Sequence, residues 1–231
     1  VQDIEMVTVT YIVDGNYFTT RQVEKGTQMT EVTNVQLDNK VGYTNSEWYT
    51  DGTYATPAAG TVDKDLELYA KHVPVQGTIA YNMNAGEDAT EPASINSTTK
   101  VYGQGATLSA TVPTREGYTF LGWGTAEDAT VASYLPGEVY STEITEKGAY
   151  NGETDVEGAG TVTLYAVWEQ KTYTITLSSG SGYTIHADRD LTVPHGERFD
   201  FRVIVDAEHA EKAPDVWLNW YTDDGTRGSQ Q

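Results

Sequence analysis

The chain has no cysteine, so no disulfide bond stabilises any part of it. It also lacks a run of about 18 apolar residues, which is roughly the length that a membrane-crossing helix needs. Basic residues are scarce: 14 Lys and Arg stand against 34 Asp and Glu, and the formal net charge is −20. A potential of this sign repels nucleic acids and anionic membrane surfaces, so we expect neither as a partner and no membrane insertion.

Catalytic and cofactor motifs are also missing. The sequence contains no Gly-x-Ser-x-Gly elbow, no phosphate-binding loop and no dinucleotide fingerprint. The acidic loops at 87–88, 151–155 and 223–225 lack the ordered spacing of a calcium loop, which leaves room only for an incidental site. The four histidines are too scattered to read as zinc ligands: His72, His186, His195 and His209. We therefore expect no enzyme, no cofactor and no metal centre, although 34 acids leave open the opposed carboxylate pair of a glycosidase.

Alternating apolar residues predict β-strands along most of the chain. Every second residue from Val7 to Val13 is Val or Tyr, which is the period of a strand with one buried face. Asp14-Gly15-Asn16 has turn chemistry and a strand-like segment follows it, so a hairpin is expected over 7–24. Residues 27–39 show no clear period and allow a short helix or a loop. In the last part of the chain, 199–205 predicts a half-buried strand and 216–220 suggests one more.

One aromatic element occurs twice. Residues 117–123, Gly-Tyr-Thr-Phe-Leu-Gly-Trp, are matched by residues 42–48, with Gly, Tyr, Thr and Trp at identical spacing. The downstream companion at 162–168, Val-Thr-Leu-Tyr-Ala-Val-Trp, is matched by residues 66–72. Tyr43 and Trp48 are an odd number of positions apart, so a bulge or bend is expected between them. This self-similarity predicts two copies of one small module.

The copies divide the chain into three modules. Pro74 cannot donate to a strand ladder and marks the first boundary, so the first module is 1–73. The second module, 74–170, carries a surface insertion at 124–158, where loops often hold specificity. The third module, 171–231, lacks the aromatic element and is expected to be a small, divergent or truncated β module.

The two elements resemble the internalin B-repeat family, also called the Listeria–Bacteroides repeat. That family's pattern is Gly-Tyr-Thr-Phe-x-Gly-Trp followed by Leu-Tyr-Ala-x-Trp, which residues 117–123 and 164–168 match fully. The first copy departs from it, with Asn45, Ser46 and Glu47 in place of Phe-x-Gly and His72 in place of the last Trp. The resemblance implies a mostly β fold of tandem, small β-grasp-like modules with little helix. It also implies a place in secreted or wall-attached proteins, without catalysis.

The repeated aromatic residues are interpreted as core. A module of this size has a thin core, and each Tyr or Trp buries roughly 150–250 Å². The predicted core residues of the repeats are Tyr43, Trp48, Leu68, Tyr69, Tyr118, Phe120, Trp123, Leu164, Tyr165 and Trp168. The same rings could instead form a sugar-stacking platform. Tyrosines outside the repeated elements are better candidates for a ligand face: Tyr134, Tyr140 and Tyr150, with Tyr102 as a further candidate.

Two functions follow as alternatives. The first is a spacer or adhesive repeat region of an extracellular, cell-surface or cell-wall protein, whose partner would be a host or bacterial surface protein or a glycan. The second is a carbohydrate-binding accessory region of a secreted enzyme. We expect a monomer, and we expect the chain, which starts at Val1 without a secretory leader, to be a piece of a longer precursor. Lys100 and Lys171 lie near strand starts and are candidate donors of an isopeptide bond.

Overall fold

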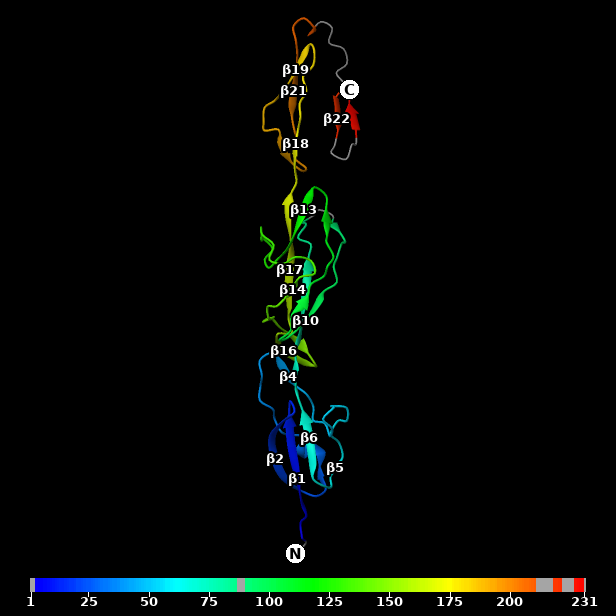
Figure 1. Cartoon of the computed structure of the whole chain (residues 1–231), viewed down its shortest axis with the longest axis vertical. Helices are drawn as coiled ribbons and strands as arrows, with labels where there is room; N and C mark the ends of the chain where they lie inside the picture. Colours follow the sequence, from blue (N-terminus) through cyan, green and yellow to red (C-terminus); the bar gives the residue numbers. More distant parts are fainter. Residues whose placement is uncertain (1–2, 87–89, 211–217, 222–226, 231) are drawn as a thin grey trace. The chain divides into compact units, whose positions relative to one another are not determined.

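The computed structural model describes residues 3–86, 90–210, 218–221 and 227–230, and its regular structure is almost entirely β (Figure 1). The helix α1 (Met29–Val32) is a single turn within the segment that allowed either a short helix or a loop. The mostly β class with little helix is therefore confirmed. Contacts divide the chain into two units, 1–114 with 120–167 and 115–119 with 168–231. The first unit holds the first module and most of the second, and the division into three modules stays a prediction.

A three-stranded sheet is the main element of the first module (Figure 1). β1 (Met6–Val13) and β2 (Asn16–Glu24) make an antiparallel hairpin, and β6 (Leu66–Ala70) pairs with β1 in parallel. The turn between β1 and β2 places Asp14 and Gly15 at φ angles of 50° and 77°, which confirms the predicted hairpin. The shorter strands of the module are β3 (Thr27–Gln28), β4 (Tyr43–Asn45), β5 (Thr61–Val62) and β7 (His72–Pro74).

The core of this module follows from the alternation on β1. Its odd-numbered residues are buried and its even-numbered residues are not, as a strand with one inward face requires. Met29 and Val32 of α1 cover this face, and Leu68 and Ala70 extend it across β6. The buried cluster comprises Val7, Val9, Tyr11, Val13, Val23, Met29, Val32, Leu37, Trp48, Val62, Leu68 and Ala70.

The second module repeats this arrangement. β8 (Gln76–Asn82) pairs antiparallel with β10 (Thr98–Val101) and parallel with β17 (Thr161–Gln170), and β13 (Tyr118–Gly124) lies beside β17. Tyr11 is the partner of Leu68 in the first module, and Tyr81 is the partner of Leu164 in the second. The two modules therefore share one register, as the sequence repeat predicted.

Additional short strands surround the second sheet. The insertion after β13 contains β14 (Val139–Tyr140), which pairs with β11 (Ala106–Thr107), and a hairpin of β15 (Lys147–Tyr150) and β16 (Glu153–Glu157). β9 (Thr90–Glu91) pairs with β12 (Thr114–Arg115). The predicted insertion is thus not a plain loop but carries strands of its own.

The third module consists of small two-stranded sheets. β18 (Thr172–Thr174) pairs with β20 (Thr192–Pro194), and β19 (Tyr183–Ala187) pairs with β21 (Phe201–Val205). β22 (Leu218–Tyr221) pairs with β23 (Arg227–Gln230), whereas position 216 of the strand predicted there lies outside the described residues. β21 confirms residues 201–205 of the half-buried strand predicted over 199–205, since they alternate between half-buried and exposed, whereas 199 and 200 precede the strand.

Candidate functional site

The two tryptophans that end the aromatic elements occupy equivalent places in the two modules. The Trp48 ring lies 5.1 Å from the Tyr11 ring, and the Trp123 ring lies 4.9 Å from the Tyr81 ring. Trp48 is 6% exposed and Trp123 is fully buried. Because Tyr11 and Tyr81 hold the same position in their sheets, each module builds its core on one Tyr–Trp pair.

Hydrogen bonds hold these rings in place. Tyr11 Oη donates to the carbonyl of Val32 at 2.8 Å, which ties α1 to the sheet. In the second module Tyr81 Oη lies 2.8 Å from Thr98 Oγ1 and accepts a hydrogen bond from the amide of Ser109. Both hydroxyls therefore have protein partners, and the fully buried Tyr11 presents no ring face to a ligand.

The ten residues predicted as core fall into two groups. Trp48, Leu68, Trp123 and Leu164 are buried. The other six are half-buried: Tyr43, Tyr69, Tyr118, Phe120, Tyr165 and Trp168. The alternation of β13 is broken at 122–124, where three successive residues are buried and Gly122 has a φ of 136°. This irregularity lets the Trp123 ring face the core although Tyr118 lies an odd number of positions away.

An ion pair between a buried lysine and a half-buried glutamate joins β10 to the insertion of the second module. Lys100 is 1% exposed, and its Nζ lies 2.8 Å from Glu143 Oε2 and donates to the carbonyl of Val101. Lys100 is the ladder partner of Gly77, at the place where Val23 pairs with Val7 in the first module. Glycine here leaves room for Ile144 and for the Gly158 carbonyl, which a Cβ at position 77 would meet within 3 Å. The Lys100 ammonium, a candidate isopeptide donor, thus forms an ion pair with the Glu143 carboxylate.

Comparison with known families agrees with this repeated geometry. The model of the Listeria-Bacteroides repeat domain matches residues 8–71 and 78–145, which together make up more than half of the chain. The chain belongs to this family. The second match ends before β17, but the parallel register of β17 on β8 makes it the counterpart of β6.

Two relatives come from Evansella cellulosilytica. One, called "Putative membrane protein", is 25% identical over 233 residues, which cover 99% of this chain and 30% of the relative. The other, called "Putative Gly-rich membrane protein", is 25% identical over 217 residues, which cover 91% of this chain and 20% of the relative. The chain therefore spans less than a third of the length of either relative.

The first Listeria–Bacteroides repeat compensates for its departures from the pattern. Ser46 replaces part of the strand ladder, because its Oγ accepts the amide of Lys71 at 2.9 Å and its amide donates to the Lys71 carbonyl. His72 stands where the second repeat has Trp168, and its Nδ1 lies 2.7 Å from Asp14 Oδ2. A His–Asp pair thus stands at the position that Trp168 holds in the second repeat.

The tyrosines proposed as a ligand face are in part committed to structure. Tyr140 is 4% exposed and its ring packs 5.2 Å from that of the half-buried Tyr134, so Tyr140 has no open face. Tyr150 is half-buried and donates from its Oη to the carbonyl of Pro74. Tyr102 packs on Tyr43 at 5.6 Å between ring centroids. The three tyrosines of the insertion do not form one exposed, coplanar platform.

A cluster of half-buried tyrosines in the first repeat was not anticipated. Tyr49 and Tyr54 meet at 5.9 Å, and the ammonium of Lys71 lies 4.3 Å from the centre of the Tyr54 ring. Tyr54 has a φ of 61°, an unusual value for a bulky residue. The Asp51 carboxylate holds this turn, because it accepts the amides of Thr53 and Thr56 at 2.9 and 2.8 Å. In the sequence, Asp51-Gly52 indicates a turn but gives no sign of the ring contact.

Acidification is expected to open this turn. The Thr53 hydroxyl hydrogen bond, with the amides of Thr56 and Ala55, holds the pKa of Asp51 well below its ordinary value. The stabilisation is therefore complete above the ordinary carboxyl pKa of about 4 and is lost progressively as the pH falls below it. Amide-exchange protection of Thr56 should fall as the pH is lowered from about 4 to about 2. The amide of Tyr49, bonded to the Tyr69 carbonyl, is the internal control, and parallel loss at both amides would contradict the prediction.

Two open grooves lie on the first repeat. One has a volume of about 430 Å³ and runs between residues 33–37 and 45–48, with Pro57 and Ala58 at its side. The other has a volume of about 240 Å³ and lies beside the β1–β2 turn. Its lining includes Asp14, Tyr17, Phe18 and His72. Neither of these two grooves is lined by the insertion, where specificity had been expected.

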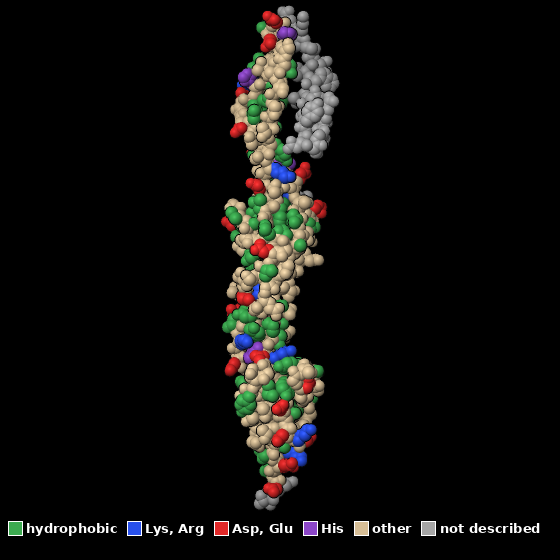
Figure 2. Space-filling view, in the orientation of Figure 1, with side chains coloured by type: hydrophobic (Ala, Val, Ile, Leu, Met, Phe, Trp, Pro, Cys, Tyr) green, Lys and Arg blue, Asp and Glu red, His purple; other side chains and the backbone are tan. Residues whose placement is uncertain are grey.

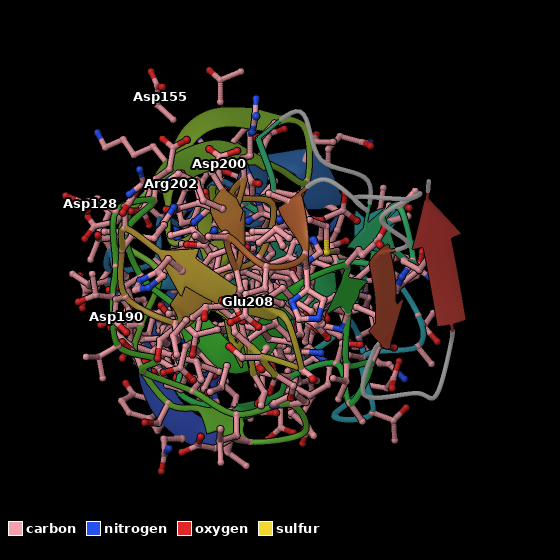
Figure 3. All side chains as sticks on the ribbon, turned by 90° about the horizontal axis from the view of Figure 1, so that it is seen from above. Asp128, Asp155, Asp190, Asp200, Arg202 and Glu208 are labelled. Carbon is pink, nitrogen blue, oxygen red and sulfur yellow. The ribbon has the colours of Figure 1, made fainter. Side chains whose placement is uncertain are left out.

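Acidic side chains are dispersed over the surface. They lie scattered over the visible face (Figure 2), and Asp128, Asp155 and Asp190 point outward in the end-on view (Figure 3). Within the described residues, no three His, Asp or Glu side chains are grouped so as to hold a metal ion. The acidic loops at 87–88 and 223–225 lie outside the described residues. No helix in the described part of the chain is long and apolar enough to cross a membrane.

Proposed function

We propose that this chain is a non-catalytic repeat region of a secreted or wall-attached bacterial surface protein, and that its modules act as a load-bearing spacer. The observation that supports this function most is the parallel pairing, within each repeat, of its first strand with the strand that ends the sheet in chain order. β1 begins the first repeat, β6 ends its sheet, and the two strands are parallel neighbours over Val9–Val13 and Leu66–Ala70. The second repeat pairs β8 and β17 in the same way over five positions.

Parallel pairing of the first and the last strand of a sheet suits a protein that is pulled by its ends. The chain enters β1 at one end of the sheet and leaves β6 at the other, because the strands run in the same direction. A pulling force then acts along both strands and across the ladder hydrogen bonds. All rungs bear the load together, whereas a hairpin pulled at its open end would lose its rungs one at a time.

The connection between the repeats supports the same function. β6, β7 and β8 follow one another with single residues, Lys71 and Val75, between them. Val75 is fully buried, which is unusual for a residue in a flexible linker. The names of the two relatives, which describe membrane proteins, fit a surface location for proteins that carry such repeats.

Single-molecule pulling on the full chain tests the spacer function. We expect separate force peaks for the first and second repeats, each followed by the release of one module's length. The variant Leu68→Ala, which shortens a buried side chain of β6, should weaken one peak and leave the other unchanged. Extension of both repeats without a force peak would contradict a load-bearing role.

A carbohydrate-binding accessory role is the second candidate, with the exposed Tyr17 and Phe18 beside the smaller groove as its best support. A glycan array probed with the full chain and with Tyr17→Ala tests it. Saturable binding that the substitution abolishes would favour this role over that of a spacer.

A further inference from the structure

The glycine that opens the first aromatic element contacts the second repeat. Gly42 has a φ of 76°, and a Cβ at this position would overlap the ring of Tyr102. The Gly42 carbonyl accepts the amide of Val75 at 2.9 Å, and the Val75 carbonyl accepts the amide of Tyr102 at 3.0 Å. The turn of one repeat, the buried connecting residue and the hairpin end of the next repeat therefore form one chain of contacts.

The same set of contacts recurs in the second unit. Gly117, which opens the second aromatic element, has a φ of 71°, and a Cβ there would overlap the ring of His195. Its carbonyl accepts the amide of Lys171 at 2.8 Å, and the Lys171 carbonyl accepts the amide of His195 at 2.8 Å. Gly42, Val75 and Tyr102 thus correspond one by one to Gly117, Lys171 and His195.

The first module shows which of these contacts belongs to a module itself. There the amide of Lys25 donates to the carbonyl of Glu5 at 2.9 Å, as Tyr102 donates to Val75. Glycines with positive φ angles follow all three hairpin ends: Gly26, Gly103 and Gly196. The bond between hairpin end and connecting residue is therefore a property of every module. The aromatic element of the preceding module adds two further contacts. Its glycine carbonyl accepts the amide of the connecting residue, and its glycine lies against the ring at the hairpin end.

We propose that the glycine of each Gly-Tyr-Thr turn is the docking site for the following module. Its carbonyl holds the connecting residue, and its missing side chain leaves the space that the ring at the next hairpin end fills. The glycine is needed for two reasons, its positive φ and the ring above it, and only the second concerns the neighbouring module. The part that this contact plays in a spacer rests on the proposed function, whereas the contact itself does not.

Amide exchange on the full chain distinguishes the two reasons. Gly15 has a φ of 77° and nothing within 4 Å of its Cβ position, so Gly15→Ala carries the same backbone strain as Gly42→Ala without a ring clash. We expect Gly42→Ala to lower the protection of the Val75 and Tyr102 amides by about tenfold or more relative to the β1 ladder amides. Gly15→Ala should leave that ratio unchanged.

A second substitution covers the case in which Gly42→Ala perturbs the whole first repeat. Gly42→Ala combined with Tyr102→Ala removes the clash and should return the Val75 amide to the protection seen in Tyr102→Ala alone. Equal effects of Gly42→Ala and Gly15→Ala, or an unprotected Val75 amide in the unmodified chain, would overturn the proposal. Either result leaves the pulling experiment as a separate test of the spacer function.

Discussion

Replacing Trp123 with alanine is expected to lower the free energy of unfolding of the second repeat by about 3–5 kcal/mol. The side chain is fully buried, and its ring lies 4.9 Å from that of Tyr81 and 5.1 Å from that of Phe120. Its removal leaves a cavity in a thin core that few other large side chains can fill. Small domains are stable by only about 5–15 kcal/mol, so this loss is a large share of the total.

Urea unfolding followed by NMR signals of β8 and β17 would assign the loss to the second repeat. Leu121→Ala is the matched control, because Leu121 lies on the same strand and is 37% exposed. It should cost less than about 1 kcal/mol. Comparable losses for the two variants would mean that Trp123 is not the centre of this core.

Replacing Glu143 with glutamine should have the next largest effect, a loss of about 2–3 kcal/mol. The substitution removes the carboxylate from Lys100, whose ammonium then lies buried without a counter-charge. A fully buried pair that loses one partner costs about 3–5 kcal/mol. The Glu143 side chain is 35% exposed, so water reaches it and the expected cost is smaller.

The double variant Lys100→Met with Glu143→Gln separates burial of charge from packing. Methionine has a similar length without the charge, so the double variant should regain most of the stability that Glu143→Gln loses. Thermal unfolding of the four chains completes the cycle. If the double variant is no more stable than Glu143→Gln, the cost arises from lost packing of the insertion and not from the charge.

The backbone plan could be predicted because it depends on local and repeated signals. Alternation from Val7 to Val13, followed by Asp14-Gly15, specifies a hairpin by its period and its turn chemistry. The spacing shared by 42–48 and 117–123 then predicted that Trp48 and Trp123 would be equivalent. Both repeats confirm this through the pairs that Trp48 and Trp123 make with Tyr11 and Tyr81.

Contacts between distant segments could not be predicted in this way. Lys100 is an ordinary polar residue in its own segment, and only the arrival of Glu143 from 43 positions away makes its burial tolerable. Tyr102 was interpreted as a ligand candidate because it lies outside the repeated elements, and no local pattern shows that Gly42 lies beneath its ring. Gly77 likewise lies within a strand and not in a turn, and its small size matters only because the insertion packs against it.

The exchange of the Val7–Val23 pair for Gly77 and Lys100 bears on how such arrays can be recombined. A chimera that joined the second hairpin to the short connection of the first repeat would bring Lys100 without Glu143, and its core would contain a lone cation. The reverse chimera would press two valines against Ile144. Crossovers between the copies are therefore tolerated only where hairpin and insertion are inherited together, and grafting experiments should respect the same boundary.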